Sequence, residues 1–325
     1  MKKVLVDRPL HREAFELLSK NVEVIEIYDD DRRKIEEALK EVDGVICSAA
    51  LKMREHQISI AENLKVIGRP GVGYDSVDVE ASSKYGIPLV YTPDGPTESV
   101  AEHVIALMLM STKSINIVQK ALREDGNFGI RTKVTGIEVE NKILGLVGFG
   151  RIGQRVGEIA SLGLGMKVVV FDPYLNKNNC TFKDFKLLGS LEELLDRSDI
   201  VSLHLPFSEA TAKLMGKEEF LQMKKSAFLI NTARGGVIDE EALIDALENK
   251  QIAGAGLDVY VKEPPETDNK LFGFDNVVAT PHLSSFTDDG KRKMGVGVVQ
   301  GVLDVLSGNM PEFIVNGEIW KKRRM

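Results

Sequence analysis

Three side chains of different chemistry each follow an apolar run in the last third of the sequence: Arg234, Glu263 and His282. Ligands of open parallel sheets bind beyond the carboxyl ends of the strands, so these side chains can converge on one ligand. Histidine titrates near neutral pH and can take up or release a proton, and a neighbouring carboxylate fixes its tautomer. A guanidinium can hold a carboxylate through two hydrogen bonds. The set predicts acid/base chemistry at His282 on an anionic ligand that Arg234 holds.

A glycine-rich turn connects an apolar run to an amphipathic segment in the middle of the chain. Gly148, Gly150 and Gly153 follow the Gly-x-Gly-x-x-Gly pattern, and Asp172 ends the next apolar run, at the spacing of a dinucleotide-binding unit. Gly148 permits a sharp turn, and Gly150 lets a pyrophosphate approach the backbone closely. Gly153 lets the helix pack closely on its strand. Phosphates then lie at the helix N-terminus, where free amides and the helix dipole stabilise them. We therefore predict a dinucleotide site formed by Gly148, Gly150, Arg151, Ile152 and Gly153.

Asp172 indicates which dinucleotide is bound. Its carboxylate can accept hydrogen bonds from both ribose hydroxyls and repels a 2′-phosphate, and Pro173-Tyr174-Leu175 contain no arginine to attract one. The sequence therefore favours NAD over NADP. With a nicotinamide to accept hydride, the three side chains fit the oxidation of a hydroxy acid, in which His282 takes the hydroxyl proton.

Two series of short apolar runs alternate with helix-like segments and predict the elements that position these residues. The first series has candidate strands at 4–6, 22–27, 44–48, 64–68 and 87–91, and the second has six, at 143–148, 167–171, 199–204, 227–232, 254–259 and 276–280. Strands that alternate with helices form parallel sheets. We expect an α/β protein of two Rossmann-like or flavodoxin-like parallel-sheet domains with a cleft between them.

Turn signals and two long helices predict the domain boundaries. Turn-forming residues cluster at 92–96, and a helix with an apolar face begins at Glu98. A final helix over about 286–306 has no further strand to cover, so we expect it to return to the first domain. These signals predict a substrate domain at 1–95 and 285–325 and an NAD-binding domain at 96–284.

Composition limits the class of protein. The chain has 325 residues, 43% of them hydrophobic, and a net charge of −7, which allows two cores and disfavours nucleic-acid binding. Its apolar runs are too short for a signal peptide or a membrane span, so we expect no membrane contact and a cytoplasmic location. Cys47 and Cys180 are interpreted as packing residues, and no metal site is expected. We expect the basic segment 321–324 to be solvated and Trp320 to pack near the chain end.

Several motifs, taken in order, resemble the D-isomer-specific 2-hydroxyacid dehydrogenase family, especially its phosphoglycerate dehydrogenase branch. The segments 71–78 and 99–103 match as well, so the resemblance covers essentially the whole chain. The motifs that carry it are the turn at 148–153, Asn231-Thr232-Ala233-Arg234-Gly235-Gly236, Gly256-Leu257-Asp258-Val259-Tyr260 with Glu263-Pro264, and Thr280-Pro281-His282.

The resemblance implies NAD-dependent hydride transfer between nicotinamide and a small D-2-hydroxy acid or its 2-keto counterpart, 3-phosphoglycerate among them. It implies that Arg234, Glu263 and His282 are the catalytic set and that the protein is a homodimer joined through the nucleotide domain. Asp258 is implied to contact the nicotinamide amide. The other residues implied to line the cofactor are His204, Pro206, Thr211, Thr232 and Ala233.

The loop at 69–73 is a candidate substrate site, as it is in the family that the sequence resembles. A glycine-flanked turn after a strand presents free backbone amides to a carboxylate. Arg69 binds an anionic substrate group or pairs with a surface acid. The candidate residues are Arg69, Gly71, Val72 and Gly73.

One position departs from the phosphoglycerate dehydrogenase pattern. That branch usually has an arginine in the segment 46–52, where Cys47 stands in this sequence. A phosphate needs cations, so the departure weakens the phosphoglycerate assignment, although Lys52 is a candidate replacement. The sequence ends soon after the final helix, so we expect no C-terminal regulatory domain of the kind that senses serine in some members.

Other functions on the same scaffold stay open. Glyoxylate or hydroxypyruvate reduction is the main rival to phosphoglycerate oxidation. Formate dehydrogenases carry an amide where Glu263 stands, which counts against formate; phosphite oxidation is harder to exclude. The alternative of another class is a binding protein that senses NAD without catalysis, and the lack of partner-binding extensions counts against it.

Overall fold

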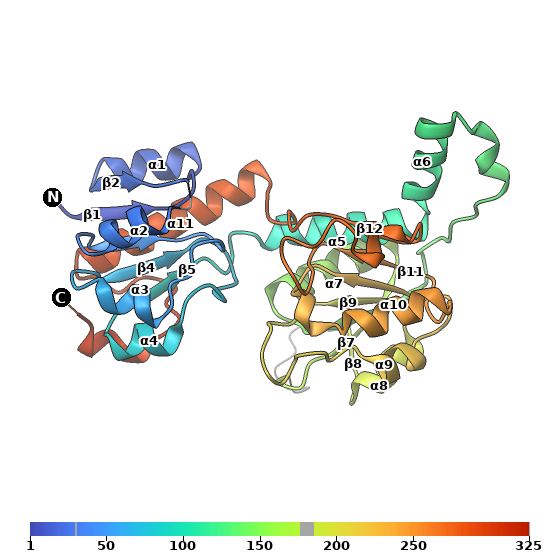
Figure 1. Ribbon diagram of the computed structural model, residues 1–325. Coiled ribbons are helices and arrows are strands. Elements are labelled where there is room, and N and C mark those ends of the chain that lie inside the picture. The colour runs from blue at the N-terminus through green and yellow to red at the C-terminus, as the bar shows by residue number, and fades with distance from the viewer. Residues whose placement is uncertain (30, 176–184, 325) are drawn as a thin grey trace. The chain divides into compact units, whose positions relative to one another are not determined.

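The computed structural model describes residues 1–29, 31–175 and 185–324 (Figure 1). Contacts divide the chain into two compact units, Met1–Thr97 with Ser285–Met325, and Glu98–Ser284. Each unit is built on a parallel sheet, which confirms the predicted fold class. Cys180 lies outside the described residues.

The first unit contains a five-stranded sheet of order β2-β1-β3-β4-β5. All of its strand pairs are parallel, because each strand is followed by a segment that crosses back over the sheet. Its strands are β1 (Lys3–Val6), β2 (Glu23–Glu26), β3 (Gly44–Ile46), β4 (Val66–Arg69) and β5 (Leu89–Tyr91). Its helices are α1 (Arg12–Ser19), α2 (Arg32–Leu39), α3 (Glu55–Ile60), α4 (Val79–Lys84) and α11 (Asp288–Leu306), with a final 3₁₀ turn, η4 (Gly317–Lys322).

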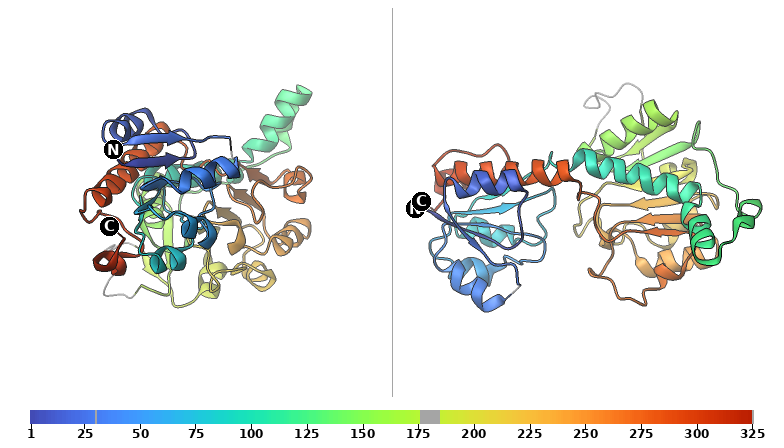
Figure 2. Two further views of the ribbon diagram at one scale, coloured as in Figure 1. Left: turned by 60° about the vertical axis from the view of Figure 1, so that its left-hand side comes forward. Right: turned by 90° about the horizontal axis from the view of Figure 1, so that it is seen from above.

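Both faces of this sheet are buried. Side chains alternate along a strand, so Leu5 of β1 joins the core under α2, α3 and α4, whereas Val4 and Val6 join the core under α1 and α11. Figure 2 shows α1 and α11 side by side on one face of the sheet. Gly68 allows α11 to lie close to β4, because a Cβ there would stand 2.7 Å from the Val302 side chain.

In the basic C-terminal segment Lys321 and Lys322 are exposed, as predicted, but Arg323 and Arg324 are docked on the first unit, so the prediction was wrong for these two arginines. The Arg323 guanidinium lies 3.8 Å from the centroid of the Trp320 ring, and Trp320 packs on the core beneath α1 and α11. Arg324 donates through Nη1 to the carbonyls of Ala61 at 2.7 Å and Glu62 at 3.0 Å. Cation–π stacking and hydrogen bonds to backbone carbonyls hold these two arginines, which charge counting alone does not reveal.

The second unit contains a seven-stranded parallel sheet of order β12-β11-β10-β9-β6-β7-β8. Helices α5 and α7 cover one core, and α8, α9 and α10 cover the other. Its strands are β6 (Ile143–Val147), β7 (Lys167–Phe171), β8 (Lys186–Leu187), β9 (Ile200–Leu203), β10 (Phe228–Asn231), β11 (Gly254–Leu257) and β12 (Val277–Ala279). Its helices are α5 (Thr97–Thr112), α6 (Ile115–Asp125), α7 (Arg151–Leu164), α8 (Leu191–Arg197), α9 (Lys217–Gln222) and α10 (Glu240–Glu248), with 3₁₀ turns η1 (Phe128–Thr132), η2 (Gly235–Val237) and η3 (Lys270–Gly273).

The strand β8 was not predicted. It has only two residues, Lys186 and Leu187, which pair with Val169 and Val170 of β7. A run of two residues has no detectable periodicity. The six predicted strands all occur, and none of the described helices is long and apolar enough to cross a membrane.

Candidate active site

The glycine-rich turn has the geometry that its sequence demands. Gly148 adopts a φ of +90°, and a Cβ there would stand 2.6 Å from the His204 carbonyl oxygen. A Cβ on Gly153 would stand 2.6 Å from the Gly148 oxygen, so only glycine lets α7 begin this close to β6. Gly150 is the N-cap of α7, and a Cβ there would meet open space. Arg151 and Ile152 begin the helix, so the turn presents a helix N-terminus with room for phosphates.

Asp172 follows β7 and is tied to the same turn. Its Oδ2 accepts the Phe149 amide at 2.9 Å, and its Oδ1 accepts the Tyr174 amide at 2.9 Å. The carboxylate lines a hollow of about 510 Å³ together with Pro173, Leu175 and Lys186. The hollow places an acceptor beside the phosphate turn, as a ribose would require. Lys186 is a cation in this hollow that the sequence did not suggest.

Two buried polar atoms at the carboxyl ends of β9 and β10 have no hydrogen-bond partner among the described residues. They are His204 Nε2 and Thr232 Oγ1. Burial lowers the pKa of His204 to about 4, so its imidazole is neutral at physiological pH. Buried polar groups are normally paired, so these two atoms fit a site completed by a bound group. Together with the open space at Gly150, they fit a dinucleotide.

Other residues implied to line the cofactor lie on the loops beside these atoms. Thr211 donates through Oγ1 to the Pro206 carbonyl at 2.7 Å, which closes the loop after β9. The Ala233 amide donates to Asn231 Oδ1 at 3.0 Å.

Arg234 is carried by a tight turn after β10. The buried Asn231 side chain accepts the Ala233 amide and donates through Nδ2 to the Arg234 carbonyl at 3.0 Å. A Cβ on Gly235 would stand 2.0 Å from the Tyr260 carbonyl carbon, so the turns after β10 and β11 are in direct backbone contact. The guanidinium donates through Nη1 to the Ala233 carbonyl. The contact between the two turns and the hydrogen bond from Asn231 fix the backbone of Arg234.

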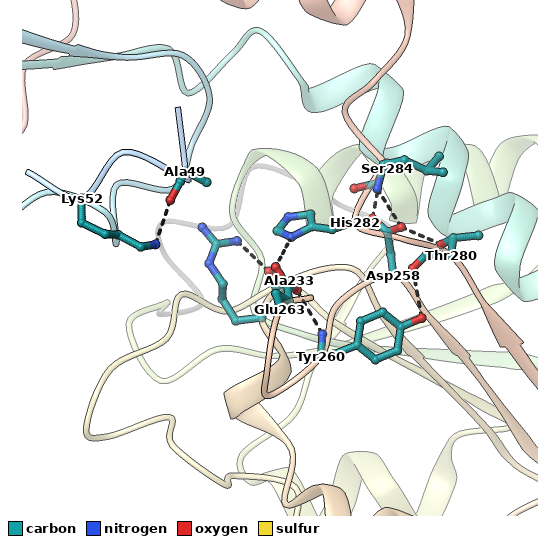
Figure 3. A network of polar contacts seen from close by, with 11 residues as sticks. Ala49, Lys52, Ala233, Asp258, Tyr260, Glu263, Thr280, His282 and Ser284 are labelled. Atoms are coloured by element: carbon teal, nitrogen blue, oxygen red, sulfur yellow. Dashed lines mark hydrogen bonds and ion pairs between the residues drawn. The ribbon is translucent and has the colours of Figure 1, made fainter. Parts of the chain in front are cut away.

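Glu263 and His282 form a pair on the turns after β11 and β12 (Figure 3). His282 Nδ1 lies 2.7 Å from Glu263 Oε2, and Glu263 Oε1 accepts the Tyr260 amide at 3.1 Å. Burial alone would raise the pKa of Glu263, but the hydrogen bonds from His282 and Tyr260 and the nearby charge of Arg234 hold it below its ordinary value. Glu263 is therefore a carboxylate at neutral pH and can only accept, so His282 Nδ1 carries the proton and Nε2 is left as the nitrogen that can exchange a proton with a ligand.

The Asp258 carboxylate, implied to contact the nicotinamide, accepts three hydrogen bonds from within the protein. It is buried, and it accepts hydrogen bonds from Thr280 Oγ1 at 2.6 Å and from the amides of Leu283 and Ser284 at 3.0 and 2.9 Å (Figure 3). A carboxylate has about four acceptor positions, so one stays available. Asp258 is thus built into the turn that carries His282.

The loop after β4 in the first unit differs from its prediction in one respect. Gly71 adopts a φ of +114°, but its amide, expected to be free, donates to Thr92 Oγ1 at 2.7 Å. A side chain with an acceptor at position 92 explains the difference. Arg69 donates to the Pro70 carbonyl, and Val72 is exposed.

The segment after β3 provides no cation at position 47. Cys47 is fully buried, and burial raises the pKa of its thiol to about 12. Lys52 donates through Nζ to the Ala49 carbonyl at 2.8 Å. Among the described residues, no group of three or more His, Cys, Asp and Glu side chains could hold a metal ion.

Sequence reasoning missed several residues that build the site. Asn231 ends β10 and Thr280 follows β12, and both lie within the last two residues of the predicted strands, so their positions at the carboxyl edge could have identified them. His103, to which no role is assigned from the sequence, lies on α5 with Nε2 3.0 Å from Thr280 Oγ1. No local pattern in the sequence indicates that contact, because 177 residues separate the two.

Fold and site define a dinucleotide-binding α/β protein with an acid–histidine pair. Residues 105–284 match the NAD-binding domain of the D-isomer-specific 2-hydroxyacid dehydrogenases. The chain belongs to this family.

Individual relatives differ in length and in name. A D-3-phosphoglycerate dehydrogenase of Methanocaldococcus jannaschii is 38% identical over 97% of this chain, which spans 60% of that protein. A hydroxypyruvate reductase of Thermotoga maritima is 37% identical over 94% of this chain and 98% of its own. The D-lactate dehydrogenase of Aquifex aeolicus, solved with NAD and lactic acid, superposes with a TM-score of 0.86 at 29% identity, covering 97% of this chain and 99% of that one. The chain thus spans about three-fifths of the phosphoglycerate dehydrogenase relative.

Replacing Asp172 with alanine is expected to reduce the preference for NADH over NADPH by about 10- to 100-fold, because hydrogen bonds to a charged acceptor contribute roughly 1.5–3 kcal/mol. Lys186 on the same hollow would then face a 2′-phosphate without a competing carboxylate. Kd values for both cofactors, measured by fluorescence, check the result. The exposed Asp275 is the control position, and an unchanged preference in Asp172→Ala would refute the assignment.

Replacing Gly235 with alanine is expected to cost about 2–4 kcal/mol of unfolding free energy, because an added methyl in a filled site forces the backbone apart. The affected backbone is the turn at Tyr260 that carries Glu263. Urea unfolding measures the loss. Gly163→Ala, where a Cβ meets nothing within 4 Å, is the matched control and should be neutral or slightly stabilising. Equal stability of both variants would contradict the tight contact.

Proposed function

We propose that the protein is an NAD-dependent oxidoreductase that transfers a hydride between nicotinamide and a small D-2-hydroxy acid or its 2-keto counterpart. The observation that carries the proposal is the Glu263–His282 pair, joined at 2.7 Å at the carboxyl edge of the dinucleotide-type sheet. The charge of Arg234 acts on the same carboxylate. Membership of the family supports this reading.

Each side chain has a distinct task in the proposed reaction. NAD, held by the turn at 148–153 and by Asp172, His204 and Thr232, supplies the hydride chemistry when bound. Arg234 holds the substrate carboxylate with a planar pair of donors. His282 Nε2 takes the hydroxyl proton in oxidation and gives it back in reduction, while Glu263 keeps the proton on Nδ1 and stabilises the imidazolium. The loop 69–73 of the first unit contacts the substrate.

The segment after β3 favours an unphosphorylated acid over 3-phosphoglycerate. A phosphate is bound by cations, and the side chain at position 47 is an uncharged, buried thiol. The Lys52 ammonium donates one of its three hydrogen bonds to a backbone carbonyl, and the charge of Arg69 acts on the Cys47 thiol. With no arginine at position 47, hydroxypyruvate and glyoxylate are the preferred candidates within the substrate class, and a phosphorylated acid would depend on Arg69 or Lys52.

A panel of 2-keto acids tests the proposed function. NADH oxidation by the purified chain is measured with hydroxypyruvate, glyoxylate, pyruvate and phosphohydroxypyruvate, and NADPH is measured in parallel. The expected result is NADH-dependent turnover with a higher kcat/KM for an unphosphorylated acid. A preference for phosphohydroxypyruvate would overturn the choice of substrate, and binding of NADH without turnover of any acid would refute the enzyme assignment.

We also propose that the protein forms a homodimer through the second unit. Helix α6 has no buried residue and stands away from the body of that unit (Figure 1). Leu122 on α6 is 52% exposed and Phe128 on η1 is 64% exposed, so this projecting segment carries large apolar side chains that a second copy of the chain would cover.

Size-exclusion chromatography with light scattering is expected to give twice the chain mass of 35.9 kDa. The double variant Leu122→Asp/Phe128→Asp should give the monomer mass at micromolar concentration, because two charges cannot be buried in an apolar interface. Leu221→Asp, at a similarly exposed leucine on α9, is the control. A monomeric wild-type chain would contradict the proposal.

A further inference from the structure

A second polar network lies behind the Glu263–His282 pair and begins on α5. His103 Nε2 is 3.0 Å from Thr280 Oγ1 and 3.6 Å from Asp258 Oδ1, beyond hydrogen-bond distance, and Thr280 Oγ1 donates to Asp258 Oδ1 at 2.6 Å. Asp258 accepts in turn the amides of Leu283 and Ser284. All five residues belong to the second unit. The network therefore links α5 to the two residues that directly follow His282.

The hydrogen bonds of this network have a defined direction. A threonine hydroxyl has one proton, and Thr280 gives it to a carboxylate, which can only accept. Thr280 Oγ1 must then accept the proton of His103 Nε2. The Leu257 carbonyl, 3.4 Å from Thr280 Oγ1, is an alternative acceptor toward which the hydroxyl can turn. A hydrogen-bond donor at position 103 thus favours the orientation in which the Thr280 hydroxyl donates to the Asp258 carboxylate.

The turn at His282 needs support of this kind. His282 adopts a φ of +52°, in the left-handed region that side chains with a Cβ seldom occupy. Such conformations persist where the surroundings hold the backbone on both sides. Before the turn, Tyr260 donates through its hydroxyl to the Thr280 carbonyl at 3.0 Å, and after it Asp258 holds two consecutive amides (Figure 3). Burial raises the pKa of Tyr260 to about 12, so the phenol retains the proton that it donates.

We infer that His103 is a positioning residue for His282: through the Thr280 hydroxyl it fixes the Asp258 carboxylate, which holds Leu283 and Ser284 and thereby the direction of the imidazole. The inference rests on the proposed function, in which His282 moves the proton. His103 itself touches neither the substrate nor the hydride in this account.

Amide hydrogen exchange and turnover of the full chain test the inference together. The test variants His103→Leu and Thr280→Val lack the donor and the hydroxyl, whereas the matched controls His103→Gln and Thr280→Ser retain them. In the test variants we expect the Leu283 and Ser284 amides to exchange about 10-fold faster, with protection elsewhere unchanged. We also expect kcat of each test variant to fall about 10-fold at an unchanged KM for NADH. The double variant His103→Leu/Thr280→Val should lose no more kcat than either single variant, because both substitutions break the same chain of hydrogen bonds. The controls should resemble the wild type.

Unchanged exchange at Leu283 and Ser284 in His103→Leu would overturn the inference, whatever the turnover. Equally faster exchange throughout α5 and β12 would also overturn it, because His103 would then stabilise packing alone. Faster exchange at the two amides with undiminished kcat would overturn the inference as well, because the turn would then not position His282 for catalysis. If the wild-type chain turns over no keto acid, the proposed function fails, whereas the exchange measurement still decides whether His103 holds the turn.

Discussion

His282→Ala is expected to lower kcat by about 10²- to 10⁴-fold, the usual cost of losing a general acid/base. His282 is the group whose Nε2 can exchange a proton with the substrate oxygen, because Nδ1 is engaged with Glu263 at 2.7 Å. Steady-state NADH oxidation measures the loss. NADH affinity should change little, because the imidazole is not among the groups proposed to hold the dinucleotide.

The control for this variant is His56→Ala. His56 lies on α3 with its side chain 64% exposed, and we assign it no chemistry. Added imidazole should restore part of the activity of His282→Ala, because the side chain that it replaces is partly open to solvent. Turnover of His282→Ala near that of the wild type would show that another group moves the proton.

Arg234→Ala is expected to lower kcat/KM for the keto acid by about 10²- to 10³-fold, because two charge-assisted hydrogen bonds to the substrate carboxylate are lost. Arg234→Lys retains the charge but not the planar pair of donors, so about a 10-fold loss should persist. The defect should appear chiefly in the KM for the acid.

Arg197 offers a matched control, since it is a surface arginine that forms an ion pair with Glu193 one helical turn away. Free guanidinium should partly rescue Arg234→Ala and leave Arg197→Ala unaffected. If the KM for the acid is the same in Arg234→Ala as in the wild type, the carboxylate is held by another residue.

The strands and the residues at their carboxyl ends could be predicted because each strand is a buried apolar run followed at once by a polar or glycine residue. Gly148 and Asp172 follow β6 and β7 at once, and Arg234 and His282 come three residues after the ends of β10 and β12. Parallel strands bring such residues to one edge of a sheet. The local pattern was therefore sufficient to identify the pair that Glu263 and His282 form.

What the sequence could not reveal depends on contacts between distant segments. Lys186 enters the hollow beside Asp172 on a strand too short to predict, and His103 reaches Thr280 across 177 residues. The docking of Arg324 on the Ala61 carbonyl and the bond from the Gly71 amide to Thr92 have the same origin. Each is a pairing of polar groups that only the packed elements bring together.

Transfer of deuterium from NADH to the product is the most direct test that the chain moves a hydride to a keto acid. NADH carrying deuterium at both C4 positions is incubated with the purified chain and hydroxypyruvate, and the product is analysed by mass spectrometry and chiral chromatography. We expect a D-2-hydroxy acid with one deuterium at C2, which the wild type forms and His282→Ala forms at a rate reduced by about 10²-fold or more. NADH binding without any labelled hydroxy acid from the panel of keto acids would refute hydride transfer and favour a protein that senses the dinucleotide.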